Sequence, residues 1–146
     1  MSSNDPGLMS PRAPEPVGAY PHARRVGNLL YLSGVGPRKR GRKDIPGVTL
    51  DTQGNATSYD IEAQCRSCFD NVRAILEDAG SGWDKIVDVL VFLTNMKKDF
   101  ARFNTLYAAY FAGDGKPNPT RTTIEVGCLP TPIAVELKVI ATIKAD

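Results

Sequence analysis

A single stripe of apolar residues in the middle of the chain does most to limit the possible folds. Between Ile61 and Ala79, apolar side chains recur at steps of three and four residues, the spacing of one face of an α-helix. They are Ile61, Cys65, Cys68, Phe69, Val72, Ile75, Leu76 and Ala79. Candidate N-caps are Thr57, Ser58 and Asp60. Gly80 can take the left-handed conformation that ends a helix. A helix with one apolar face must pack against another layer.

Several segments around this helix have the composition of strands. Val87 to Leu93 is an almost unbroken apolar and β-branched run, which predicts a strand buried on both faces. Residues 25–33 predict a hairpin with a type II′ turn at Gly27-Asn28. A second helix is expected over Lys98 to Phe111, followed by two strands over Thr122 to Val126 and Ile133 to Thr142. The predicted order is β-β-α-β-α-β-β, an α+β class with two helices on one face of a mixed sheet. The other face then needs a cover, and self-association supplies one in so small a chain.

The bulk properties fit one ordinary domain. A chain of 146 residues is one domain in length, and a net charge of +2 favours neither nucleic acid nor membrane as a partner. Residues 1–16 are rich in Pro, Ser and Asn and lack the apolar core of a signal peptide. We expect them to form a tail, either flexible or draped over the protein, before a single domain over 17–146. The three cysteines are an odd set, so reduced thiols in a cytoplasmic protein are expected.

The sequence lacks the motifs of zinc sites and gives little support for a hydrolase triad. Zinc deaminases need His-x-Glu, but the one histidine lies in His22-Ala-Arg24. Cys65 and Cys68 fall on the apolar stripe without further ligands at metal-site spacing, so we expect no metal. His22 could be the general base of a hydrolase, or a structural residue. No phosphate-binding glycine loop of the Walker or dinucleotide type is present.

A basic run, Arg38 to Lys43, carries the densest charge in the chain. It is compatible with a solvated loop, with contacts to a phosphate backbone, or with a positive rim that attracts an anionic substrate. No aromatic residue interleaves it, so base stacking is unsupported.

Arg121 and Glu136 are the strongest candidates for catalysis. Arg121 begins a predicted strand, where a guanidinium can bind a carboxylate through two parallel hydrogen bonds. Glu136 lies on what we expect to be the neighbouring strand and could hold or activate water, with a pKa that partial burial raises. A structural salt bridge between the two is the alternative.

An ordered series of segments resembles the RidA/YjgF family of enamine/imine deaminases over residues 17–144. The segments are Val17-Gly18-Ala19-Tyr20, Leu32-Ser33-Gly34, Phe69-Asp70-Asn71-Val72 with Ala79-Gly80, Phe103-Asn104-x-x-Tyr107-x-x-Tyr110-Phe111, Pro119 to Val126, Leu129-Pro130 and Val135-Glu136. The resemblance implies a chorismate-mutase-like α+β fold and a homotrimer, or a hexamer, with sites between subunits. It implies no cofactor.

The resemblance also implies roles for individual residues. Arg121 would bind the substrate carboxylate, and Glu136 would position the hydrolytic water. The other residues that it places in the site are Tyr20 and Asn104 in the cleft, Gly34 and Thr123 where the backbone contacts ligand, and His22 as a further candidate for substrate binding.

Three features depart from the common family pattern. Thr123 stands where a cysteine is common, Gly34-Val35 replaces the usual Gly-Gln, and an insertion spans about Lys39 to Leu50. With residues 20–25, this pattern is similar to the 2-aminomuconate deaminase branch, which forms 4-oxalocrotonate and ammonia. The expected partner is therefore a small anionic mono- or dicarboxylate substrate. The alternatives are a general 2-aminoacrylate/2-iminopropanoate deaminase, an RNA-binding protein and a ligand-binding regulator of the same fold.

Overall fold

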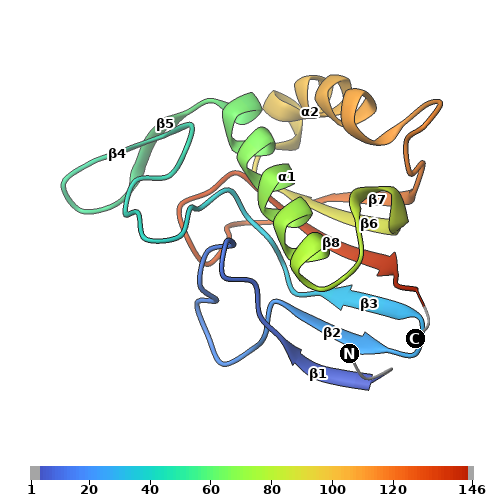
Figure 1. Ribbon diagram of the computed structural model, residues 1–146. Coiled ribbons are helices and arrows are strands. Elements are labelled where there is room, and N and C mark those ends of the chain that lie inside the picture. Colours follow the sequence, from blue (N-terminus) through green and yellow to red (C-terminus); the bar gives the residue numbers. More distant parts are fainter. Residues whose placement is uncertain (1–3, 145–146) are drawn as a thin grey trace.

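The computed structural model describes residues 4–144, and two helices lie on one face of a mixed sheet (Figure 1). The helices are α1 (Ile61–Asp78) and α2 (Met96–Phe111), with a 3-10 turn at Trp83–Lys85. The sheet has the order β1-β2-β3-β8-β6-β7. Its strands are β1 (Asn4–Leu8), β2 (Ala23–Val26), β3 (Leu29–Leu32), β6 (Ile86–Leu93), β7 (Thr120–Glu125) and β8 (Val135–Thr142). The predicted α+β class is confirmed.

The local signals for α1 are confirmed. The Asp60 side chain accepts hydrogen bonds from the main-chain nitrogens of Glu62 and Ala63, and Gly80 has the expected positive φ of 88°. The apolar stripe is buried against the sheet. In contrast, α2 starts two residues before the predicted Lys98, because Asn95 is its N-cap and accepts from the Lys98 nitrogen.

A second, two-stranded sheet extends away from the body of the domain (Figure 1). It pairs β4 (Val48–Leu50) with β5 (Ala56–Tyr59), and the turn between them contains Gly54, whose φ is 82°. The Tyr59 hydroxyl donates to Asp99 Oδ2 at 2.7 Å, which fastens this hairpin to α2. The end of the predicted insertion therefore forms ordered structure.

Strand β6 is buried on one face only, so the prediction of burial on both faces is wrong for the single chain. Val89, Val91 and Leu93 point to the helices and are fully buried, whereas Leu90 and Phe92 on the opposite face are half-buried. The reason is that both helices lie on the same side of the sheet. Apolar side chains continue across the uncovered face. They are Val26, Leu29, Tyr31, Val87 and Ile124, all exposed, and the half-buried Leu90, Phe92 and Ile140.

Residues 4–16 are ordered against the domain, which corrects the flexible one of the two alternatives for the tail. Strand β1 pairs with β2 at the edge of the sheet, with Asn4 opposite Val26. Farther along, Ala13 is completely buried and Ser10 is 2% exposed. A polar, Pro-rich segment is ordered here because its main-chain groups find partners on β2 and on basic side chains. Residues 1–3 of the expected tail lie outside the described residues.

The cysteines are reduced in the structure. Cys65 and Cys68 are buried and Cys128 is exposed, and all three are free thiols. Within residues 4–144, no cluster of His, Cys, Asp and Glu could hold a metal ion. No helix in this part of the chain has the length and apolar character needed to cross a membrane.

Candidate active site

Glu136 lies on β8 and points to the open face of the sheet, since its neighbours Val135 and Leu137 point into the core. Its carboxylate lies directly over Gly34. A Cβ atom at residue 34 would be 2.6 Å from Glu136 Oε2, so only glycine leaves room for the carboxylate in this position. Burial raises the pKa of Glu136 above its ordinary value, and the positive charge of Arg38 partly opposes this.

A small cavity adjoins this carboxyl group. Its lining includes Tyr20, Gly34, Arg38, Thr131 and Glu136. Tyr20 is 42% exposed, and its hydroxyl accepts a hydrogen bond from the Val17 nitrogen. Three of the predicted site residues, Tyr20, Gly34 and Glu136, are thus brought together in one copy of the chain.

Buried polar residues of α1 hold the loop that carries Gly34 and Arg38. Ser67 Oγ donates to the Pro37 carbonyl at 2.6 Å, and Asn71 Nδ2 donates to the carbonyls of Gly36 and Arg38 at 2.9 and 2.6 Å. Ser67 and Asn71 are not among the site residues predicted from the sequence. The sequence nevertheless contains a pattern that could have indicated them: Gln64, Ser67 and Asn71 are polar side chains at helical spacing beside the apolar stripe.

Arg121 lies on β7 and points toward α2. Its Nη2 donates to Asn104 Oδ1 at 2.7 Å, and its guanidinium carbon is 4.6 Å from the centre of the Tyr107 ring. The half-buried guanidinium is therefore oriented by an amide and by cation–π contact. It makes no ion pair within residues 4–144, which leaves its charge available to an incoming carboxylate.

Thr123 follows Arg121 on the same face of β7. Its Oγ1 is buried and has no hydrogen-bond partner among the described residues. Arg121, Asn104 and Thr123 thus form a second group of predicted site residues, on the helix side of the sheet.

The two groups lie on opposite faces of the sheet, which corrects the expected pairing of Arg121 with Glu136. Strand β6 runs between β7 and β8, so their strands are not neighbours. Arg121 is opposite Val89 on the core face, whereas Glu136 is opposite Phe92 on the open face. Within one copy of the chain, Arg121 and Glu136 therefore form no salt bridge and do not share a site.

His22 fixes the N-terminal segment. It is 6% exposed, and its Nδ1 accepts from the Ser10 nitrogen at 2.8 Å while Nε2 donates to the Pro14 carbonyl at 2.7 Å. Both ring nitrogens are therefore occupied by main-chain groups, and neither is free to act as a base. These contacts support a structural role for His22 and not a role as general base. Its ring also borders a hollow next to Gly34.

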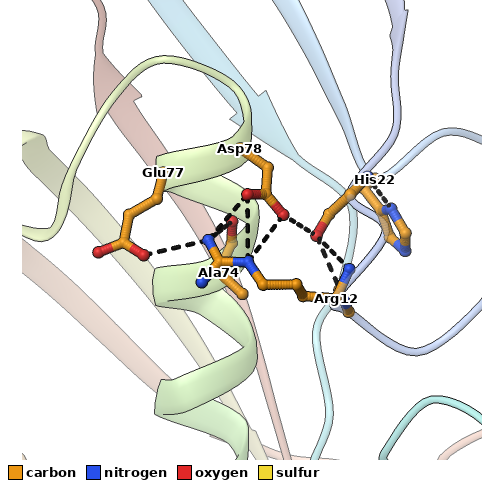
Figure 2. Close-up of polar contacts among 7 residues, drawn as sticks. Arg12, His22, Ala74, Glu77 and Asp78 are labelled. Atoms are coloured by element: carbon orange, nitrogen blue, oxygen red, sulfur yellow. Dashed lines mark hydrogen bonds and ion pairs between the residues drawn. The ribbon is translucent and has the colours of Figure 1, made fainter.

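The same segment is clamped onto the end of α1 (Figure 2). Arg12 Nη2 donates to Asp78 Oδ1 at 2.8 Å and to Glu77 Oε1 at 3.1 Å. Asp78 Oδ2 also accepts from the Ser10 hydroxyl at 2.6 Å. The Arg12 guanidinium and the Ser10 hydroxyl hold the pKa of Asp78 below its ordinary value. These contacts explain why the segment is ordered and why Pro14 and Pro16 can line the hollow next to Gly34 that His22 also borders.

Most of the basic run is engaged inside the molecule. Arg40 donates to the carbonyls of Ser10 and Ala13 and pairs with Glu15. Arg42 pairs with Asp44, and Lys39 donates to Asn71 Oδ1 at 3.4 Å. Arg40 therefore clamps the N-terminal segment, and Arg38 is the member of the run that borders the cavity beside Glu136.

The domain is thus an α+β unit with a carboxyl-containing cavity on one side of its sheet and, on the other, a guanidinium that has no ion pair among the described residues. The sequence matches the family described as Endoribonuclease L-PSP over residues 10–143. The chain belongs to this family, which includes the RidA/YjgF and RutC proteins.

Individual relatives agree with this assignment. A RutC family protein of Pyrococcus abyssi is 33% identical over 135 residues, covering 92% of this chain and 94% of the relative. The 2-iminobutanoate/2-iminopropanoate deaminase of Escherichia coli is 31% identical over 134 residues, with the same coverage. The crystal structure of E. coli TdcF with bound serine matches with a TM-score of 0.80 and 28% identity, covering 96% of this chain and all of that one.

Proposed function

We propose that the protein is a hydrolytic deaminase of small enamine or imine carboxylates that needs no cofactor. One observation carries the proposal: a half-buried carboxyl group with a raised pKa borders a cavity, and the Arg121 guanidinium has no ion pair within residues 4–144. The name of the E. coli relative, a deaminase of 2-imino acids, supports this reaction class. The serine bound to TdcF supports a small ligand with a carboxylate beside a nitrogen.

The proposed chemistry needs a held carboxylate and proton transfer. An enamine first tautomerises to an imine. Water then adds to the imine carbon, the carbinolamine loses ammonia, and a 2-oxo acid remains. Arg121 binds the substrate carboxylate through its planar guanidinium. Glu136 accepts a proton from the attacking water and returns it to the leaving nitrogen, a role that suits a carboxyl group whose pKa lies above the ordinary value.

We propose that this site is completed between copies of the chain. The two residues lie on opposite faces of one sheet, so a shared site needs Arg121 from one copy and Glu136 from another. The exposed apolar side chains of the open face give such copies a surface to bury. A homotrimer, or a hexamer built from two, satisfies this arrangement because a head-to-tail interface closes into a ring.

The narrower proposal for the substrate is 2-aminomuconate, which would yield 4-oxalocrotonate and ammonia. It is supported by the insertion over about residues 39–50 and by the pattern over residues 20–25. The general alternative, hydrolysis of 2-iminopropanoate formed from 2-aminoacrylate, is supported by the E. coli relative. Tyr20, Gly34, Asn104 and Thr123 are proposed to bind the substrate in either case. His22 is proposed only to hold the N-terminal segment that lines the hollow next to Gly34.

RNA cleavage, the activity in the family's description, finds less support in the geometry. Three of the five cations in the run Arg38 to Lys43 that could bind phosphates already have partners: Lys39 and Arg40 make internal contacts, and Arg42 is paired with Asp44. His22 has no free ring nitrogen for general-base catalysis. We therefore propose deamination and treat RNA cleavage as an outcome of the test.

Ammonia release tests the proposal. Purified protein should release ammonia from 2-aminomuconate or from 2-iminopropanoate generated in the assay, and Glu136→Gln should abolish most of that release while keeping the fold. The proposal is wrong if the wild-type protein accelerates neither reaction, or if it cleaves RNA at a rate that Glu136→Gln does not change.

A further inference from the structure

Arg38 differs from its neighbours in the basic run. Arg40 and Arg42 have carboxylate partners, but Arg38 makes no ion pair within residues 4–144. Its Nη2 donates to a neutral acceptor, the Glu15 carbonyl, at 2.9 Å. The side chain is half-buried and borders the cavity that Glu136 also lines. A half-buried guanidinium without a counter-charge beside a cavity is a binding group for an anion.

The position of Arg38 is fixed before any ligand arrives. Its carbonyl accepts from Asn71 Nδ2 at 2.6 Å, and the preceding carbonyl accepts from Ser67 at 2.6 Å. Its guanidinium is held by the Glu15 carbonyl, and Glu15 itself is paired with Arg40. Little side-chain freedom remains to be lost on binding, which favours selective recognition.

Arg38 and Glu136 do not form an ion pair with each other, although both border the same cavity and the charge of Arg38 acts on Glu136. The space between them is therefore open to a ligand group. A carboxylate there would be attracted by Arg38, while the substrate's other carboxylate would be held by Arg121. A monocarboxylate would leave one of these two cations unused.

We propose that Arg38 is a substrate-binding residue that selects substrates with a second carboxylate, which it holds in the cavity beside Glu136. This inference rests on the proposed function, because it assigns the substrate class of the same site. It predicts that binding of dicarboxylates, but not of monocarboxylates, depends on Arg38.

Unreactive acids separate this inference from the question of turnover. Adipate and hexanoate have six carbons each and differ by one carboxylate. Titration calorimetry should show that the wild-type protein binds adipate on the order of tenfold more tightly than hexanoate, the factor that about 1.4 kcal/mol corresponds to. Arg38→Met should remove this preference. Arg38→Lys should keep part of it, because the charge stays and the planar fork is lost.

Arg42→Met is the matched control. It removes the same charge from the same loop, but Arg42 is exposed and paired with Asp44 away from the cavity. It should leave the adipate preference intact. The inference is overturned if the wild-type protein does not prefer adipate, or if Arg38→Met keeps the preference, or if Arg42→Met reduces it as much.

A second measurement separates binding from a merely structural role. Arg38 lowers the pKa of Glu136, so Arg38→Met should move the acid limb of the kcat profile to higher pH, whereas Arg42→Met should not. A preference for adipate in a protein that releases no ammonia would support Arg38 and refute the deaminase proposal. Ammonia release without the preference would do the reverse.

Discussion

Replacing Gly34 with alanine tests whether the position of the Glu136 carboxylate matters. The new Cβ would lie 2.6 Å from Glu136 Oε2 and 2.9 Å from its Cδ. To reach ordinary contact at 3.4 Å, the carboxylate must move by about 0.8 Å away from Gly34. Gly34 has no positive φ, so the backbone itself is not strained by the substitution. The atoms that must move form the end of a flexible side chain, and the fold should survive.

The effect on turnover should be much larger than the effect on stability. Misplacement of a reacting group by about 1 Å costs on the order of 10²-fold in rate, so Gly34→Ala should lower kcat by roughly 10- to 100-fold. Since Arg121 lies on another face of the sheet, binding of the substrate carboxylate by its guanidinium should change less.

Ammonia release and thermal unfolding, measured on the same preparations, provide the assay. Gly127→Ala is the control, because a Cβ at residue 127 meets nothing within 4 Å and that glycine has no positive φ. It should match the wild type in both measurements. If Gly34→Ala is as active as Gly127→Ala, the carboxylate does not need its observed position, and the proposed role of Glu136 fails.

Substitutions at three further residues should have different effects. Arg121→Ala should raise KM more than Arg121→Lys does. The rise for Arg121→Ala should correspond to a loss of binding free energy on the order of 2–5 kcal/mol if the ion pair between Arg121 and the substrate is desolvated. Unchanged KM values would exclude Arg121 from the site. Glu136→Gln should lower kcat and abolish its acid limb, which in the wild type should lie above the pKa of an ordinary glutamic acid because burial raises the pKa of Glu136. Asp78→Asn should lower the melting temperature at neutral pH. The pKa of Asp78 is lowered in the folded state, so its contribution to stability is present above the ordinary carboxyl pKa and is lost as pH falls through the pKa of the folded state. The melting temperatures of the wild type and of Asp78→Asn should therefore converge in acid. A constant difference down to low pH would show that the clamp does not depend on that charge.

The elements with strong local signals could be predicted from the sequence. The apolar stripe, the cap at Asp60 and Gly80 determine α1 almost alone, since each acts within a few residues. The membership of the two site groups also followed from the resemblance. Their arrangement did not, because the order of strands is a long-range property: β6 enters the sheet between β7 and β8 and separates Arg121 from Glu136.

The N-terminal segment shows the opposite limit. Its composition predicts flexibility, yet it is ordered by partners far away in the chain: Asp78 binds Arg12, and Arg40 binds the Ala13 carbonyl. No local pattern reveals such contacts. For the same reason the basic run could not be divided in advance into Arg40, which clamps this segment, and Arg38, which faces the cavity.

Mixing two inactive variants tests the central claim, a deaminase site shared between copies, most directly. At a substrate concentration far below the raised KM of Arg121→Ala, this variant and Glu136→Gln are each expected to release little ammonia. If each site takes Arg121 from one copy and Glu136 from the next around a closed ring, random reassembly of an equimolar mixture restores about one quarter of the sites. Ammonia release should therefore recover to about one quarter of the wild-type rate after the variants are dissociated and reassembled together. A mixture that stays as inactive as its components, although it has formed mixed oligomers, would contradict the account.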